Sequence, residues 1–172
     1  MKIRIAYENE EYTIFKFSPS LLHLYLHGID NMYFTKKVRF LLNYLTGGSL
    51  YYIKEKGQGK LIGYCMVSKG KAFHYRFAEK DDITLGALYL KKAWRGKRLS
   101  VLLLETILRD NADAGNAYAY IHRVNKQSNA LFSHLGFEPV CNVEIARLSR
   151  QVSCTDKADT DYRLYKRPLS AR

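Results

Sequence analysis

Apolar and polar residues alternate or recur along the chain with the periods of short strands and helices. Alternation over 2–7 predicts a first strand. A Ser-Pro pair at 18–19 suits a helix start, and the leucine-rich run over 21–26 that follows it predicts a first helix. Apolar positions at helical spacing predict a second helix over 33–45, which ends before a Gly-Gly pair.

The rest of the chain continues this mixture of strands and helices. The further predictions are strands at 49–55 and 60–67 joined as a hairpin, a short strand or irregular extension at 71–77, a strand at 83–90, a helix at 99–111, a strand at 117–122, a helix at 128–135, and strands at 137–148 and 162–165. The polar segment 149–161 is expected to be a mobile loop. We predict one α/β domain over 1–172: a twisted α+β mixed sheet of roughly six to seven strands, flanked by about four helices.

Charge is the unusual feature of the composition. The chain of 172 residues carries 28 Lys and Arg against 16 Asp and Glu, a formal net charge of +12. Such a charge favours anionic partners and weakens the case for a cationic substrate. No apolar run has the length of a membrane span, so no membrane association is expected. With no apolar signal core at the start, the three cysteines (Cys65, Cys141 and Cys154) are expected to be free thiols in the cytoplasm.

The most informative stretch is a strand that runs through a basic loop into a helix. Five basic residues fall within 91–98, and the helix starts at about residue 99. A helix N-terminus exposes backbone N–H groups without partners, and the helix dipole adds positive potential, so this arrangement suits a phosphate group. A solvated basic turn before a helix would give the same pattern. A second stretch, 125–137, follows a strand and also fits an ordinary N-capped helix that ends at a glycine.

Taken together, the two stretches resemble the GNAT superfamily of N-acetyltransferases. The family motif Arg/Gln-x-x-Gly-x-Gly/Ala corresponds to 95–100, and the family pattern Asn-x-x-Ala-x-x-Leu-Tyr-x-x-x-Gly-Phe corresponds to 125–137. The resemblance covers almost the whole order of elements, with 95–111 as pyrophosphate loop and helix. The coenzyme-binding residues that it implies are Leu88, Leu90, Arg95, Gly96, Lys97, Arg98, Leu99, Ser100, Asn125, Ser128 and Phe132.

Three positions depart from the family pattern. Arg98 and Ser100 stand where the family has glycines, which permit close backbone approach to phosphate. Arg98 can still offer its backbone N–H if its φ is helical, and its guanidinium could pair with a phosphate such as the 3′-phosphate of coenzyme A. Phe132 stands where many members have a tyrosine that protonates the leaving thiolate, so another group or water must supply that proton.

The resemblance implies transfer of an acetyl or similar acyl group from acetyl-coenzyme A (acetyl-CoA) to an amine, by direct attack in a ternary complex and without a metal. Backbone N–H groups near Leu88 and Leu90 are expected to polarise the thioester carbonyl. His122, Asp82 and Thr84 are the candidates for the general base.

The acceptor pocket of the family lies at the first two helices, where His27 and Tyr33 are the candidate substrate-binding residues. A basic surface suits a small anionic acceptor, while amines on proteins or peptides and alcohols stay open. Two other functions stay open as well: a basic nucleic-acid- or ribosome-associated module, and a GNAT-like protein that binds coenzyme A without catalysis. The basic residues are spread along the chain without a known nucleic-acid motif, so nucleic acid is the less favoured partner. A homodimer through 141–148 and the C-terminal strand is a further option.

Overall fold

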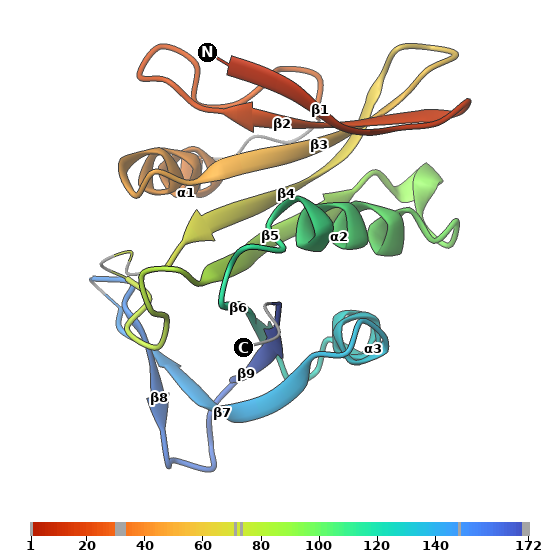
Figure 1. The fold of residues 1–172 in the computed structure, drawn as a ribbon. Coiled ribbons are helices and arrows are strands. Elements are labelled where there is room, and N and C mark those ends of the chain that lie inside the picture. The colour runs from red at the N-terminus through yellow and green to blue at the C-terminus, as the bar shows by residue number, and fades with distance from the viewer. Residues whose placement is uncertain (1, 30–33, 71, 73, 148, 170–172) are drawn as a thin grey trace. The chain divides into compact units, whose positions relative to one another are not determined.

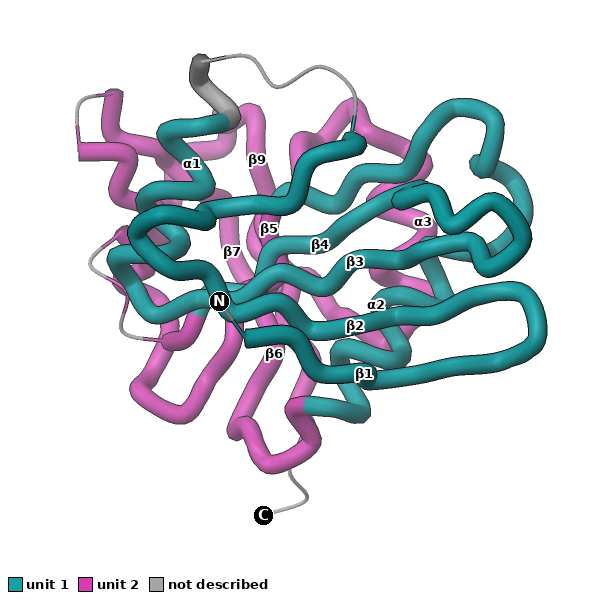
Figure 2. The backbone as a smooth tube through the Cα atoms, turned by 90° about the horizontal axis from the view of Figure 1, so that it is seen from above, with its two compact units in different colours: residues 1–68, 87–110 teal, residues 69–86, 111–172 magenta. Residues whose placement is uncertain are grey.

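The computed structural model describes residues 2–29, 34–70, 72, 74–147 and 149–169. Its elements are β1 (Lys2–Glu8), β2 (Tyr12–Ser18), α1 (Phe34–Leu45), β3 (Ser49–Glu55), β4 (Leu61–Lys69), β5 (Ile83–Leu90), a short 3₁₀ helix (Lys92–Trp94), α2 (Leu99–Asp110), β6 (Asn116–His122), α3 (Lys126–His134), β7 (Glu138–Ile145), β8 (Val152–Thr155) and β9 (Tyr162–Pro168). The nine strands follow the order β1-β2-β3-β4-β5-β6-β9-β7-β8 (Figure 1). Two compact units divide the chain, with unit 1 at 1–68 and 87–110 and unit 2 at 69–86 and 111–172 (Figure 2).

Unit 1 is built on the antiparallel strands β1 to β4. Because side chains alternate across a sheet, Phe15 and Phe17 of β2 share a face with Tyr52 of β3. These rings pack with Phe40 of α1 in one buried cluster. The opposite face carries Tyr51, whose hydroxyl donates to Asp110 at the end of α2. The helices α1 and α2 therefore cover opposite faces of the unit 1 strands.

Unit 2 combines the start of β5 with β6, β9, β7 and β8. The first residues of β5 pair in parallel with β6, and β9 pairs antiparallel with both β6 and β7. The core of this unit includes Val143, Val152 and Leu164, each about 1% exposed. Parallel pairing of β5 and β6 requires a crossover, which the chain makes through α2.

The predicted fold class is confirmed, since helices and a mixed sheet alternate as expected. The sheet has nine strands rather than six or seven, and three α-helices lie within the described residues. Two strands were missed. β2 is one, where the adjacent apolar residues Ile14 and Phe15 interrupt the alternation. The other, β8, lies inside the segment 149–161 that was expected to be a loop.

The helix predicted over 21–26 is wrong. Ser20 and His23 instead exchange two backbone hydrogen bonds, of 3.0 and 2.9 Å, which close a tight turn. Leu21 and Leu22 at its tip are 70% and 87% exposed. The apolar residues of this run do not form a one-sided stripe, and a segment this short is not stable as a helix without one.

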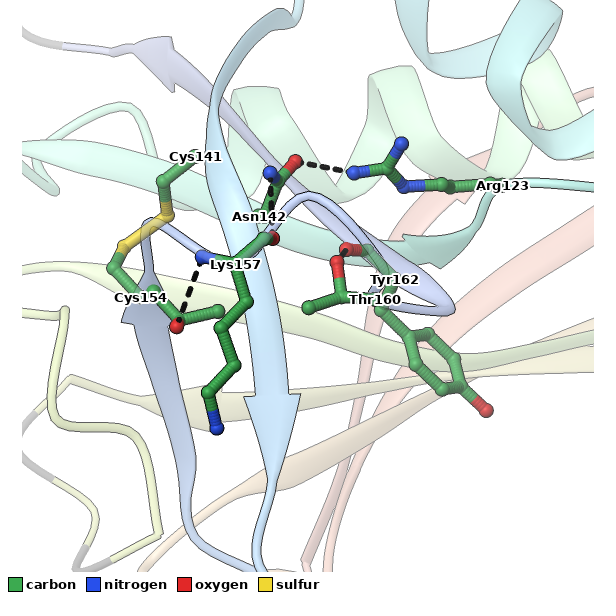
Figure 3. Close-up of a disulfide and its surroundings, with 8 residues drawn as sticks. Arg123, Cys141, Asn142, Cys154, Lys157, Thr160 and Tyr162 are labelled. Atoms are coloured by element: carbon green, nitrogen blue, oxygen red, sulfur yellow. Dashed lines mark hydrogen bonds between the residues drawn. A yellow bond between two sulfur atoms is a disulfide. The ribbon is translucent and has the colours of Figure 1, made fainter.

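The expectation of three free thiols is also wrong. Cys141 and Cys154 form a disulfide, while Cys65 is a buried free cysteine. Figure 3 shows the disulfide beside Asn142, whose side chain accepts from Arg123 at 2.5 Å and donates to the carbonyl of Lys157 at 3.0 Å. These contacts and the β7–β8 pairing fix the segment that follows β7. Within the described ranges, no helix is both long and apolar enough to cross a bilayer.

Candidate functional site

The strand β5 passes directly into the basic loop. At the end of the strand, the backbone N–H of Lys91 donates to the carbonyl of Ile62 at 2.8 Å. After the 3₁₀ turn, the side chain of Arg95 reaches back and donates from Nε to the carbonyl of Leu90 at 3.1 Å. This bond fixes the guanidinium at the strand end and leaves its other donors available at an exposed position.

Two residues of the loop adopt a left-handed backbone. Gly96 has a φ of 79° and Arg98 a φ of 56°. Glycine takes this conformation freely, whereas for another L-residue it costs about 1–2 kcal/mol. Arg98 therefore does not have the helical φ that was the stated condition for its N–H to face a phosphate. Arg98 adopts a conformation that suits the glycine found at this position in the family pattern.

The start of α2 offers backbone donors to a ligand. The carbonyl of Arg98 accepts the first helical hydrogen bond, from Leu102 at 3.1 Å, so Arg98 is the N-cap residue. An arginine side chain has only donors and cannot cap the helix. The first turn, which begins with Leu99 and Ser100, has no acidic residue. The N–H groups of this turn have no acceptor within the helix, and with the helix dipole they favour an anion.

The cations around this helix start are held in different ways. Lys91 donates from Nζ to the carbonyl of Gly28 at 3.0 Å. Lys97 places its Nζ 4.7 Å from the centre of the Trp94 ring. Arg95, Lys97 and Arg98 are all exposed. Because no carboxylate lies in the first turn of α2, this end of the helix is strongly cationic.

The register between β5 and β6 is short. It comprises Ile83 with Ala117 and Thr84 with Tyr118, although the strands are eight and seven residues long. Leu88 and Leu90, the predicted positions for polarising a carbonyl, lie beyond these pairs. Leu90 is 8% exposed, and Leu88 is half-buried.

In unit 2, α3 begins with a side-chain cap. The side chain of Asn125 accepts from the backbone N–H of Ser128 at 3.1 Å. Phe132 is 5% exposed and packs edge-on against Phe137, with ring centres 5.0 Å apart. Asn125 therefore acts as an ordinary N-cap of α3. Phe132 is a core residue of the same helix.

His122 ends β6 in a half-buried position. Its ring lies edge-on to Tyr162, with centres 5.0 Å apart. Its Nδ1 accepts a long hydrogen bond, 3.4 Å, from the backbone N–H of Val124. When Nδ1 accepts, the proton of the neutral ring lies on Nε2, so in this arrangement neither ring nitrogen is free to accept a proton.

The structure gives Asp82 a role in holding the fold. Its carboxylate accepts from Asn116 and from the backbone of Glu79, each at 2.8 Å, and its carbonyl accepts from Gly70 at 2.6 Å. Asp82 precedes β5 and is 3% exposed. A carboxylate with both oxygens bonded in this way stabilises the corner before β5, which makes it a poor candidate for a general base.

Thr84 is completely buried in β5. Its hydroxyl has no hydrogen-bond partner among the described residues. An unsatisfied buried hydroxyl destabilises a fold by roughly 1–3 kcal/mol. This side chain is therefore the least well explained of the predicted catalytic residues.

The predicted acceptor residues are only partly described. His27 is exposed and lies edge-on to Tyr25, with ring centres 5.5 Å apart. Tyr33 lies outside the described residues. Sequence reasoning missed the aromatic series that begins with Tyr25. Neighbouring ring centres along this series are 5.2, 5.5 and 5.8 Å apart, in the order Tyr25, Phe40, Tyr64 and Tyr89.

The aromatic series belongs entirely to unit 1 and ends on β5. Tyr89 lies between Leu88 and Leu90, so strand alternation turns its side chain to the other face. Burial raises the pKa of Tyr64, while the charge of Arg39 acts in the opposite direction. The hydroxyl of Tyr64 is therefore protonated at neutral pH. Alternation along 83–90 was the sequence signal that could have found Tyr89. Among the described residues, no group of three His, Cys, Asp or Glu side chains could hold a metal ion.

Comparisons with solved structures show the same fold in acetyltransferases. The ribosomal-protein-S18-alanine N-acetyltransferase from Escherichia coli is 14% identical, with a TM-score of 0.62, over 94% of this chain and 96% of that chain. An acetyltransferase from Thermus thermophilus is 19% identical, with a TM-score of 0.58, over 83% and 79% of the two chains. A GNAT-family acetyltransferase from Staphylococcus aureus is 17% identical, with a TM-score of 0.52, over 74% and 72%.

Among curated proteins, none matches this chain. The model of the acetyltransferase (GNAT) family matches residues 18–137, which is more than half of the chain. This range includes the basic loop, the start of α2 and the whole of α3. The loop geometry, the fold and this match agree, and the chain belongs to the GNAT acetyltransferase family.

Proposed function

We propose that this protein transfers an acetyl group from acetyl-CoA to the amine of a small acceptor. The observation that carries the proposal is the start of α2. Its N-cap residue, Arg98, has a side chain without an acceptor and holds a left-handed φ of 56°. A pyrophosphate accepts hydrogen bonds from such a helix start and is favoured by its dipole.

Backbone groups and two cations of the loop each have a place in this proposal. The backbone N–H groups from Arg98 onward bind the pyrophosphate, and the small side chain of Ser100 leaves room for it. Arg95, held by its bond to Leu90, and the exposed Arg98 pair with the remaining phosphate charge, including the 3′-phosphate. The pantetheine arm then runs along β5. The predicted contributions of Asn125, Ser128 and Phe132 remain predictions.

The reaction needs few protein groups. The neutral amine attacks the carbonyl carbon of the thioester, a C–N bond forms, and the C–S bond breaks. Backbone N–H groups near Leu88 and Leu90 stabilise the negative charge that develops on the carbonyl oxygen. The amine loses one proton, and the departing sulfur gains one. Holding both substrates together supplies much of the rate.

A proton donor for the sulfur must replace the tyrosine that Phe132 does not provide. We keep His122 as the candidate: as an imidazolium it can give its Nε2 proton to the sulfur and is left as the neutral ring. The general base stays open. The carboxylate of Asp82 is committed to hydrogen bonds, and water can accept the amine proton when the acceptor's own pKa is low.

For the acceptor, we propose contact with Tyr25 and Tyr89, the two half-buried ends of the aromatic series of unit 1, whose middle members are buried. The net charge of +12 supports an anionic amine rather than a polyamine. The Escherichia coli relative in fold is named for an alanine of a ribosomal protein. A peptide amine is therefore the alternative class of acceptor.

The proposal is tested first by ligand-dependent thermal stability. Acetyl-CoA at 100 times its dissociation constant should stabilise the protein by about 2.7 kcal/mol. An oligonucleotide of equal charge should give a smaller and salt-sensitive shift. Stabilisation by the oligonucleotide alone would reject the acetyltransferase and favour a nucleic-acid-binding module.

Catalysis is tested by release of coenzyme A thiol with a panel of amines that includes anionic small molecules and an N-terminal alanine peptide. Turnover with any amine supports the enzyme. Coenzyme binding without thiol release across the panel would favour a binding protein instead. His122→Ala should lower the maximal rate more than the apparent affinity for the amine, and an unchanged pH profile would reject its role as proton donor.

A further inference from the structure

A second cationic feature lies at the other end of unit 1, on the strands β1 and β2. A cavity of about 200 Å³ is lined by Lys2, Arg4, Lys16 and Ser18, which we call the β1–β2 basic cluster. Lys2 lies opposite Ser18 and Arg4 lies opposite Lys16 in the antiparallel register. Residues two apart on paired strands share a face, so the four side chains form one patch. Figure 1 shows both strands at the N-terminal end of the chain.

The cluster lies on the face that α2 covers, at the C-terminal end of that helix. Arg4 donates to the carboxylate of Asp110 at 2.5 Å, and Nζ of Lys16 lies 3.7 Å from the same carboxylate. A helix of twelve residues is about 18 Å long. The cluster is therefore separated by the length of α2 from the loop that we assign to the coenzyme.

The charges in the cluster do not balance. Arg4 and Lys16 share the carboxylate of Asp110, and Lys2 lines the same cavity. Three cations against one carboxylate and the partial negative charge of a helix C-terminus leave about +1.5 charges. The direct pairing of Arg4 with Lys16 adds like-charge repulsion across the strands. Lys2 has no ion pair with any described residue. An anion in the cavity would relieve this repulsion.

The size and chemistry of the cavity limit what the anion can be. Pockets for drug-sized ligands are roughly 300–1,000 Å³, so this one suits a smaller group. Two ammonium groups, a guanidinium and a hydroxyl provide donors from several directions, as a tetrahedral oxyanion requires. The side chain of Lys16 is only 28% exposed, which reduces the screening of its charge by solvent.

We propose that the β1–β2 basic cluster binds a tetrahedral oxyanion, namely a phosphate group or sulfate. The site is independent of the acetyl-transfer reaction and does not rest on it. Lys2, Lys16 and Ser18 donate to the oxyanion, and Arg4 shares its guanidinium between the oxyanion and Asp110.

The test is an NMR titration of the whole protein with inorganic phosphate, in which sodium chloride keeps the ionic strength constant. Backbone amides of 2–4 and 16–18 should shift and saturate. In the variant Lys2→Gln/Lys16→Gln the affinity measured at these amides should fall roughly tenfold. The control Lys54→Gln/Lys60→Gln removes two exposed lysines of the β3–β4 hairpin and should leave the affinity unchanged within about twofold.

Three results would overturn the proposal: equal shifts with chloride alone, full affinity in the Lys2→Gln/Lys16→Gln variant, or shifts confined to 95–101. The last result would leave the coenzyme loop intact as a phosphate site, so failure of this inference is distinct from failure of the proposed function. Because Lys16 also contacts Asp110, the variant Lys2→Gln/Ser18→Ala repeats the test without touching that ion pair. Titration with sulfate and with glycerol 3-phosphate then distinguishes a site for a free ion from one that accepts a phosphate ester.

Discussion

The helices α2 and α3 begin in opposite ways. At α3, the side chain of Asn125 accepts from the backbone N–H of Ser128 at 3.1 Å. At α2, the N-cap position is held by Arg98, whose side chain has no acceptor and whose φ is 56°. Neither helix has an acidic residue in its first turn.

This difference separates a helix start that the protein satisfies from one that it leaves to a ligand. Asn is among the best N-cap residues, and its effect on stability needs no further partner. An Arg with a left-handed backbone at the same position is unfavourable on both counts. Such a local departure is expected at a functional site, where the ligand supplies what the sequence omits.

The largest expected effect comes from placing a carboxylate in the first turn of α2. Ser100→Asp should weaken coenzyme A binding at least 100-fold, or about 2.7 kcal/mol, because its charge repels the pyrophosphate. The fold should not suffer, since an acid near a helix N-terminus is favourable. Calorimetric titration with coenzyme A gives the first quantity and thermal unfolding the second.

The matched control is Gln127→Asp, at the equivalent position of α3. It should leave coenzyme A affinity within a few-fold of the parent and raise stability by a few tenths of a kcal/mol. Equal losses of affinity in both variants would contradict the assignment of the pyrophosphate to α2 alone.

A smaller effect is expected at the other end of α2, where Asp110 opposes the helix dipole. Burial raises the pKa of Asp110, but hydrogen bonds from Arg4 and Tyr51 and the charges of Arg4 and Lys16 leave it lowered overall. A lowered carboxyl pKa stabilises the fold above the unfolded value of about 3.9, and this contribution is lost as the pH falls through the folded value. Asp110→Asn should therefore cost about 1–2 kcal/mol at pH 7.

The pH dependence provides the check on this prediction. Thermal unfolding of both proteins at pH 7 and near pH 3 should show a difference that shrinks at the lower pH. A loss of the same size at both values would mean that packing around Asp110, rather than its charge, stabilises this end of α2.

The comparison also explains which features the sequence could predict. The strand 83–90, the helix that follows it and the N-cap at Asn125 are set by local patterns, and the structure agrees within one or two residues. The helix predicted at 21–26 failed because the hydrogen bonds between Ser20 and His23 compete with it. The Ser-Pro pair at 18–19, which suggested a helix start, gives no sign of these two hydrogen bonds.

Features that depend on distant residues could not be predicted. The disulfide joins Cys141 to Cys154 only because β7 and β8 pair. The hydrogen bond that Asn116 donates to Asp82 spans 34 residues, which no local pattern connects. The positive φ of Arg98 could not be predicted either, because an arginine gives no local signal for a left-handed backbone.

At the start of α3, Asn125→Ala should destabilise the protein by about 1 kcal/mol, because the N–H of Ser128 loses its acceptor. Thermal or urea unfolding measures this loss. If Asn125 is only a cap, coenzyme A affinity should stay unchanged. A drop in affinity without a drop in stability would instead support the coenzyme contact that the family pattern implies, and would weaken the contrast between the two helices.

The smallest effect, and the most direct probe of the contrast, is expected at Arg98 itself. Arg98→Gly should relieve about 1 kcal/mol of left-handed strain, while the added freedom of the unfolded chain offsets up to that amount, so stability should be equal or slightly higher. Arg98→Ala keeps the strain and removes the same guanidinium. Both variants should bind coenzyme A several-fold more weakly, and in thermal unfolding the alanine variant should match the parent while the glycine variant should be equally or slightly more stable. Lower stability in the glycine variant than in the alanine variant would show that the loop does not require a positive φ at this residue.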